Sequence, residues 1–201
     1  MTDLAFELKR GVLKQVNAWR GRYVFIHINK TGGTSVERAL HLRSERKTAL
    51  EKLGEMGRAR FDRAFKFAFV RNPWDKVVSH YHYRVRTNRT GLADEGISFH
   101  DWVSRAYGER DPRYHDEPKM FMPQVCWVGD EAGRCIIDFV GRFERLSDDF
   151  AEVCRRIGVD AALPRIKTTS HTHYREAYDD ETRRIIAERF AADLEAFAYT
   201  F

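Results

Sequence analysis

The most constraining feature of this 201-residue chain is a short apolar run that leads directly into a glycine turn. Residues 23–28 read Tyr-Val-Phe-Ile-His-Ile, a composition typical of a buried strand. The turn Asn-Lys-Thr-Gly-Gly-Thr-Ser follows at 29–35, and residues 36–40 have the composition of a helix. We expect Thr34 or Ser35 to cap that helix, because hydroxyl oxygens accept hydrogen bonds from first-turn N–H groups. The sequence therefore predicts a strand, a loop and a helix in immediate succession.

A second apolar run, residues 65–70, has the same relation to a following helix. It reads Phe-Lys-Phe-Ala-Phe-Val and ends at Arg-Asn-Pro, where Pro73 suits the first turn of a helix over 74–84. The intervening residues 43–63 have helical character, and parallel strands need a long connection that is usually helical. We therefore expect the two runs to be parallel neighbours in one sheet.

The remaining segments complete an α/β pattern within one domain. We expect an amphipathic helix over 1–20, loops at 86–96 and 108–123 around a helical piece at 99–107, a third strand at 135–140, helices at 146–157 and 179–197, and a basic loop at 164–173. Strands that alternate with helices indicate a central parallel sheet flanked by helices. A chain of 201 residues supplies one well-buried core and scarcely two, so we expect a single domain over 1–201.

The composition excludes several classes of protein. Lys and Arg outnumber Asp and Glu by 35 to 30, and the resulting net charge of +5 suits an anionic ligand. Basic residues alternate with acidic ones, which disfavours nucleic-acid binding. The three cysteines lack C-x-x-C spacing, so neither a zinc site nor a disulfide framework is indicated. Since no apolar run reaches the length of a transmembrane segment or forms a signal core, we expect a cytoplasmic protein.

The glycine turn has the residue types of a phosphate-binding loop. A helix that begins after such a turn presents unpaired N–H groups and a partial positive charge to an anion. Lys30 adds an ammonium group, and two glycines allow the backbone to close around phosphate oxygens. A Walker A loop has its lysine after the glycines, whereas Lys30 precedes both, which argues against an ordinary nucleoside triphosphatase. The alternative is a tight structural turn with a solvated Lys30.

The second strand supplies a further pair of candidate ligands. Arg71 stands at the end of the strand and Ser79 about two turns along the next helix. Ligands of open α/β sheets bind at the carboxyl ends of the strands, so both residues are expected at that edge. A bidentate guanidinium and a hydroxyl can hold a second phosphate.

Both motifs resemble those of the carbohydrate sulfotransferases of sulfotransferase family 2, which includes chondroitin and related Golgi enzymes and many bacterial members. Residues 27–35 read H-I-N-K-T-G-G-T-S, which resembles the family's usual 5′-phosphosulfate loop H-I-P-K-T-G-G-T-S, with Asn29 at the common proline position. Residues 67–74 with Ser79 resemble its 3′-phosphate motif, R-N-P followed by S. The likeness continues at residues 138–144 and 178–182.

The resemblance implies a sulfotransferase fold related to the nucleotide kinases and a donor substrate, 3′-phosphoadenosine 5′-phosphosulfate (PAPS). It implies that Arg71 and Ser79 hold the 3′-phosphate and that the glycine turn holds the 5′-phosphosulfate. The turn residues so implied are Lys30, Thr31, Gly32, Gly33, Thr34 and Ser35.

The same resemblance sets expectations for the chemistry. Sulfuryl transfer needs an in-line acceptor and stabilisation of charge on the leaving oxygen, a role for Lys30, and this scheme requires no metal. Family members often carry a base histidine in an H-x-T-A-like segment, but residues 44–49 here contain none. His41 and Glu45 are the nearest substitutes as general base. The family's acceptors imply a hydroxyl group on a glycan or glycolipid.

Two other functions stay open at this point. The missing histidine allows a protein that binds PAPS without transferring its sulfuryl group. A small-molecule kinase could use the same scaffold, although the position of Lys30 before the glycines and the lack of an evident magnesium carboxylate disfavour it.

Overall fold

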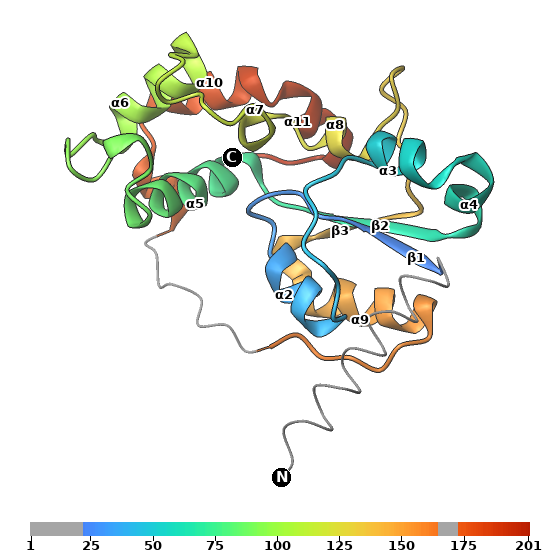
Figure 1. Ribbon diagram of the computed structural model, residues 1–201. Helices are drawn as coiled ribbons and strands as arrows, with labels where there is room; N and C mark the ends of the chain where they lie inside the picture. Colours follow the sequence, from blue (N-terminus) through green and yellow to red (C-terminus); the bar gives the residue numbers. More distant parts are fainter. Residues whose placement is uncertain (1–21, 165–172) are drawn as a thin grey trace. The chain divides into compact units, whose positions relative to one another are not determined.

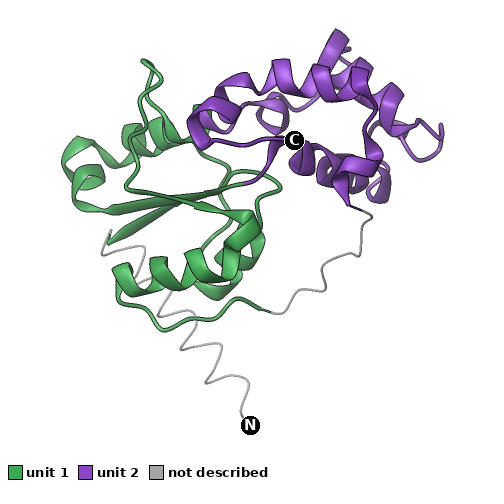
Figure 2. Cartoon of the chain, turned by 180° about the vertical axis from the view of Figure 1, so that it is seen from behind, with its two compact units in different colours: residues 1–70, 126–167 green, residues 71–125, 168–201 purple. Residues whose placement is uncertain are grey.

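The computed structural model describes residues 22–164 and 173–201 (Figure 1). The chain forms two compact units, each built from two separate segments (Figure 2). Unit 1 comprises residues 1–70 and 126–167, and unit 2 comprises residues 71–125 and 168–201. The helix predicted at 1–20 and most of the basic loop predicted at 164–173 lie outside the described residues.

Unit 1 contains a three-stranded parallel sheet in the order β1-β2-β3. The strands are β1 (Tyr23–Ile26), β2 (Phe65–Val70) and β3 (Phe139–Arg142). Phe67 of the central strand pairs with Phe25 on one side and with Phe139 on the other. Parallel sheets are covered on both faces, which explains why β2 is almost continuously apolar. The sheet confirms the predicted α/β class and the predicted parallel pairing.

Helices cover the two faces of this sheet. In Figure 1, α2 (Gly33–Ala39) and α9 (Leu146–Ile157) lie on one side, and α3 (Ala49–Met56) and α4 (Arg58–Arg63) lie on the other. The core between the sheet and the first pair is formed by Val36, Leu40, Phe67, Phe69, Phe150 and Val153. This packing fixes α2, and with it the loop that precedes α2, against the sheet.

Unit 2 is helical in the part of the chain that the structure describes. Its long helix α5 (Pro73–Arg86) confirms the helix predicted at 74–84 but extends one residue before it and two residues beyond it. The Asn72 side chain accepts a hydrogen bond from Trp74 N at the start of this helix. Its core contains Trp74, Trp102, Tyr107, Phe121 and Phe190. The other helices are α6 (Phe99–Val103), the π-helical turn η2 (Ser104–Glu109), α7 (Pro118–Phe121), α10 (Asp180–Arg189), α11 (Ala191–Phe197) and the short 3₁₀ turns η1 (Arg89–Gly91) and η4 (Tyr174–Ala177). The short helix α8 (Val125–Val128) begins at the last residue of the first segment of unit 2 and continues into the second segment of unit 1. In unit 1, the 3₁₀ turn η3 (Phe143–Arg145) precedes α9.

Several element boundaries differ from the sequence prediction. The predicted strand at 135–140 is wrong in its bounds, because the Asp138 carboxylate accepts the Lys66 N–H at 2.7 Å and parallel pairing begins only at Phe139. The predicted closing helix at 179–197 is interrupted at Phe190, whose φ of −112° and ψ of 24° end one helix and start the next. The segment 43–63 is helical only from residue 49.

The described part of the chain, residues 22–164 and 173–201, contains no helix with the length and apolarity needed to span a bilayer.

Candidate functional site

The predicted phosphate loop connects β1 to α2 with two left-handed residues. Lys30 has φ 65° and Gly32 has φ 80°. The prediction of a Thr34 or Ser35 cap is wrong, because α2 begins one residue after Gly32 and no described side chain caps it. A left-handed lysine costs about 1 kcal/mol relative to glycine, and such conformations persist where the surrounding structure enforces them. The loop therefore holds Lys30 in a defined conformation.

The side chains of the loop divide into buried and solvent-facing groups. Thr31 is fully buried, and its hydroxyl donates to the Ile28 carbonyl oxygen at 2.9 Å. A hydroxyl group has a single hydrogen, so the Thr31 side chain closes the loop and only its backbone N–H remains as a donor to an anion. Thr34 is exposed, and Lys30 and Ser35 are partly exposed. These three residues supply the polar side chains of the loop's outer surface.

Gly33 is required by close packing between the loop and His27. The His27 side chain is only 3% exposed, and its ring stacks on Phe25 with 5.5 Å between ring centroids. A Cβ atom at Gly33 would overlap Cδ2 and Nε2 of His27. The second glycine of the motif thus makes room for an imidazole ring and is not simply a flexible residue.

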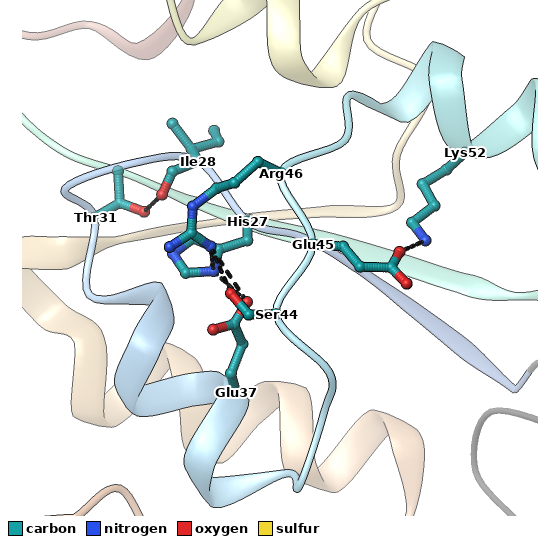
Figure 3. A network of polar contacts seen from close by, with 8 residues as sticks. All are labelled: His27, Ile28, Thr31, Glu37, Ser44, Glu45, Arg46 and Lys52. Atoms are coloured by element: carbon teal, nitrogen blue, oxygen red, sulfur yellow. Dashed lines mark hydrogen bonds and ion pairs between the residues drawn. The ribbon is translucent and has the colours of Figure 1, made fainter. Parts of the chain in front are cut away.

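His27 belongs to a polar cluster with Glu37 and Arg46 (Figure 3). His27 Nδ1 contacts both Glu37 Oε1 and Arg46 Nη1, and Arg46 Nη1 lies 3.4 Å from Glu37 Oε1. Burial lowers the pKa of His27, the hydrogen bond to Glu37 opposes that shift, and the Arg46 charge adds to it. The imidazole is therefore neutral at pH 7, and the cluster joins the end of β1, helix α2 and the segment before α3.

Sequence reasoning missed this cluster. One signal was present, because Glu37 follows Gly33 by four residues and so lies on the same face of the helix. That face receives the His27 ring. Arg46 had no comparable signal, since it reaches the cluster from a segment without regular secondary structure between α2 and α3.

The two candidates for the general base lie at different places in unit 1. His41 follows the C-terminal end of α2, whereas the phosphate loop precedes the N-terminal end. The Glu45 carboxylate forms an ion pair with Lys52 of α3 and faces away from His27 (Figure 3). The structure does not bring the two side chains together, and a base at either position stays a prediction.

The second motif lies in unit 2, whereas the phosphate loop lies in unit 1. The Arg71 guanidinium makes two parallel contacts with the Asp75 carboxylate, Nε to Oδ2 at 2.7 Å and Nη2 to Oδ1 at 2.8 Å. This bidentate geometry is the strong form of a charge-assisted hydrogen bond. Ser79 follows Asp75 by four residues on α5 and is partly exposed on the same face. Asp75 thus holds Arg71 along the face of α5 that carries Ser79.

Comparison with known proteins decides the family. The model of the sulfotransferase family matches residues 20–200. The chain belongs to the sulfotransferase family. The resemblance that the two motifs indicated is thereby confirmed, and family membership makes the protein a transferase of sulfuryl groups.

The sulfotransferase is also similar to an uncharacterized protein of Archaeoglobus fulgidus. The two are 32% identical over 123 residues, which cover 60% of this chain and 91% of the archaeal protein. No solved structure matches the chain. Within the described residues, no group of three or more His, Cys, Asp or Glu side chains has the arrangement of a metal site.

Proposed function

We propose that this sulfotransferase transfers the sulfuryl group of PAPS to a hydroxyl group of a glycan or glycolipid. The observation that carries the proposal is the glycine loop between β1 and α2, in a chain that belongs to the sulfotransferase family. The loop combines a left-handed Lys30, a buried Thr31 that closes the turn, and a glycine packed on His27. These features suit a fixed cradle for the 5′-phosphosulfate.

In the proposed complex the loop binds the 5′ end of the donor. Backbone N–H groups of Thr31, Gly32 and Gly33 would donate to phosphate oxygens, because N–H groups at a turn and at the start of a helix favour anions. Lys30 would add a charge, and Thr34 and Ser35 would add hydroxyl donors from the outer surface of the loop. Donors of this kind need little rearrangement when charge develops on the leaving oxygen.

Arg71 and Ser79 would bind the 3′-phosphate. Asp75 holds the guanidinium through two hydrogen bonds, which restricts its orientation before the ligand arrives. Preorganisation of this kind lowers the entropy cost of binding. Ser79 would contribute a neutral and therefore weaker hydrogen bond.

The proposed reaction is an in-line displacement at sulfur. The acceptor oxygen forms a bond to sulfur while the bond between sulfur and the 5′-phosphate oxygen breaks, and adenosine 3′,5′-bisphosphate leaves with the bonding electron pair. The acceptor proton passes to a general base, for which His41 and Glu45 are the proposed candidates. Lys30 would stabilise the charge that develops on the leaving oxygen.

Incubation with labelled PAPS and a panel of glycans and glycolipids tests this proposal. Transfer of label to an acceptor is the expected result. Tight binding of PAPS with no transfer to any acceptor would instead support a binding protein without transfer activity. Magnesium-dependent turnover of ATP would support the kinase alternative. If transfer occurs, Glu45→Gln and His41→Ala identify the base, since its loss should lower transfer but leave nucleotide binding unchanged.

A further inference from the structure

The backbone of Arg71 is held by the side chain of Gln124, which lies 53 residues further along the chain in the same unit. The Arg71 N–H donates to Gln124 Oε1 at 2.9 Å, and Gln124 Nε2 donates to the Arg71 carbonyl oxygen at 2.8 Å. A backbone N–H can only donate and a carbonyl can only accept, so one orientation of the amide satisfies both groups. Gln124 therefore pairs with Arg71 as a neighbouring strand would, directly after β2 ends at Val70.

Gln124 is in turn fixed by Asp193 of α11. Both side chains are 0% exposed. Asp193 Oδ2 accepts from the Gln124 backbone N–H at 2.9 Å and from Gln124 Nε2 at 3.2 Å, and Oδ1 accepts from the Val125 N–H at 2.9 Å. Both hydrogens of the Gln124 amide are thus in use, which leaves this side chain a single orientation.

A buried cation balances the charge of Asp193. Lys76 of α5 is 2% exposed, and its Nζ has no hydrogen-bond partner among the described residues. The Lys76 ammonium lies 5.0 Å from the centre of the Phe190 ring and is attracted by the Asp193 carboxylate. Because Lys76 compensates the charge without a hydrogen bond, the Asp193 oxygens stay available to Gln124 and Val125. An isolated buried carboxylate would be far more costly.

We propose that Gln124 is a positioning residue for Arg71, and that Asp193 acts through Gln124. The inference rests on the proposed role of Arg71 in binding the 3′-phosphate. Asp75 fixes the guanidinium end of Arg71 and Gln124 fixes its backbone end, so the whole residue is ordered before a ligand arrives. The affinity for the 3′-phosphate therefore depends on a buried amide that need not contact the ligand.

The test compares two nucleotides that differ only in the 3′-phosphate. Gln124→Met removes both hydrogen bonds to Arg71 but keeps the length of the side chain. In titration calorimetry of the full chain, this variant should bind adenosine 3′,5′-bisphosphate about tenfold more weakly and adenosine 5′-monophosphate within about twofold of the wild type. In an Arg71→Ala background, Gln124→Met should cause no further loss, because the two residues act as a unit.

Two further variants separate positioning from general stability. Thr182→Val removes the hydrogen bonds of a buried side chain in the capping box of α10 and should leave the ratio of the two affinities unchanged. Asp193→Asn keeps both bonds between Gln124 and Arg71 but loosens the support of Gln124, so it should give a smaller selective loss, about threefold. It also serves as the test if Gln124→Met does not fold. In the wild type, the Arg71 amide hydrogen should exchange with solvent as slowly as those of the core.

The outcomes distinguish this inference from the proposed function. If Arg71→Ala weakens the bisphosphate selectively but Gln124→Met and Asp193→Asn weaken both nucleotides equally, Gln124 is only structural and the inference is wrong. Fast exchange of the Arg71 amide hydrogen also overturns it. If Arg71→Ala itself weakens both nucleotides equally, the 3′-phosphate role of Arg71 is wrong, and the proposed function fails at that site.

Discussion

Lys30 is the residue whose loss should affect transfer most. Its proposed contact strengthens as charge develops on the leaving oxygen, so Lys30→Ala should lower turnover about 10²–10³-fold. Binding of adenosine 3′,5′-bisphosphate should fall less than about tenfold, which calorimetry and a transfer assay together would show. Lys47→Ala removes a lysine from the same unit that is paired with Glu55 and serves as the control. Equal losses in turnover and binding would contradict the proposed role of Lys30.

The buried side chain of Lys76 should make the stability of the folded protein depend on pH. Burial lowers the pKa of Lys76 from its ordinary 10.5 to about 8, a shift that Asp193 opposes and Arg189 reinforces. Between pH 8 and pH 10.5, Lys76 is still protonated in the unfolded chain but has released its proton in the folded chain. The free energy of unfolding therefore rises with pH over this range. The free energy of unfolding of the wild type, relative to that of Lys76→Met, should rise by about 3 kcal/mol from pH 8 to pH 10.5. Chemical denaturation of both proteins across this pH range measures the difference. If the free energies of unfolding of the two proteins change with pH in parallel, burial does not shift the pKa of Lys76.

Residues of the site differ in how far the sequence could predict them. The loop and Arg71 stand in contiguous motifs, so reading the sequence in order was enough to find them. Gln124 and Asp193 are 69 residues apart and carry no local signal, because their role depends on which backbone groups the fold places beside them. The packing of His27 on Gly33 could not be predicted for a related reason. A glycine in such a motif suggests a need for backbone freedom, whereas in the structure any side chain at this position would overlap the His27 ring.

At the scale of elements, the predictions succeeded where a strong local signal marks the end of the element. Helix α9 was predicted with its observed bounds, and Gly158, which ends it in a left-handed conformation, is such a signal. Strand β2 was also predicted with its observed bounds, and Pro73 follows it closely. The third strand was misplaced because Asp138 replaces one backbone partner with its carboxylate, a tertiary contact that an apolar run cannot indicate.

The first residue of α2, Gly33, packs directly against the His27 ring that follows β1. The importance of this close contact can be tested. Gly33→Ala would push the new methyl group into the His27 ring, which the contacts with Glu37 and Arg46 prevent from moving aside. We expect a loss of stability of about 1–3 kcal/mol, the usual cost of overpacking, together with weaker binding of PAPS. Thermal unfolding and calorimetry measure the two effects. Gly54→Ala is the matched control, because a Cβ at that helical position meets no other atom within 4 Å. Equal stability of both variants would show that His27 does not fix the loop.

At the scale of the whole molecule, neither unit is a continuous segment of the chain. Unit 1 takes β1 and β2 from before residue 71 and takes β3 and α9 from after residue 125. Unit 2 likewise needs α10 and α11 to complete the core around Trp74. A long connection thus separates the two halves of each core, and the pairing of β2 with β3 is a non-local contact whose formation carries the entropic cost of closing a long loop.

A fragment that ends at Val125 tests this dependence. Residues 1–125 keep β1, β2 and α2 but lose Phe150 and Val153, which cover Phe67 and Phe69 in the intact core. The lost burial of the two phenylalanines alone amounts to about 3–6 kcal/mol, a large part of a net stability of about 5–15 kcal/mol. The fragment also lacks Ile186 and Phe190 from the core of unit 2, which adds to that loss. The fragment should therefore show no cooperative thermal transition by circular dichroism. Addition of residues 126–201 should restore one, because that fragment carries the missing half of each core. A sharp transition in the 1–125 fragment alone would mean that β1, β2 and their helices form a stable structure without residues 126–201.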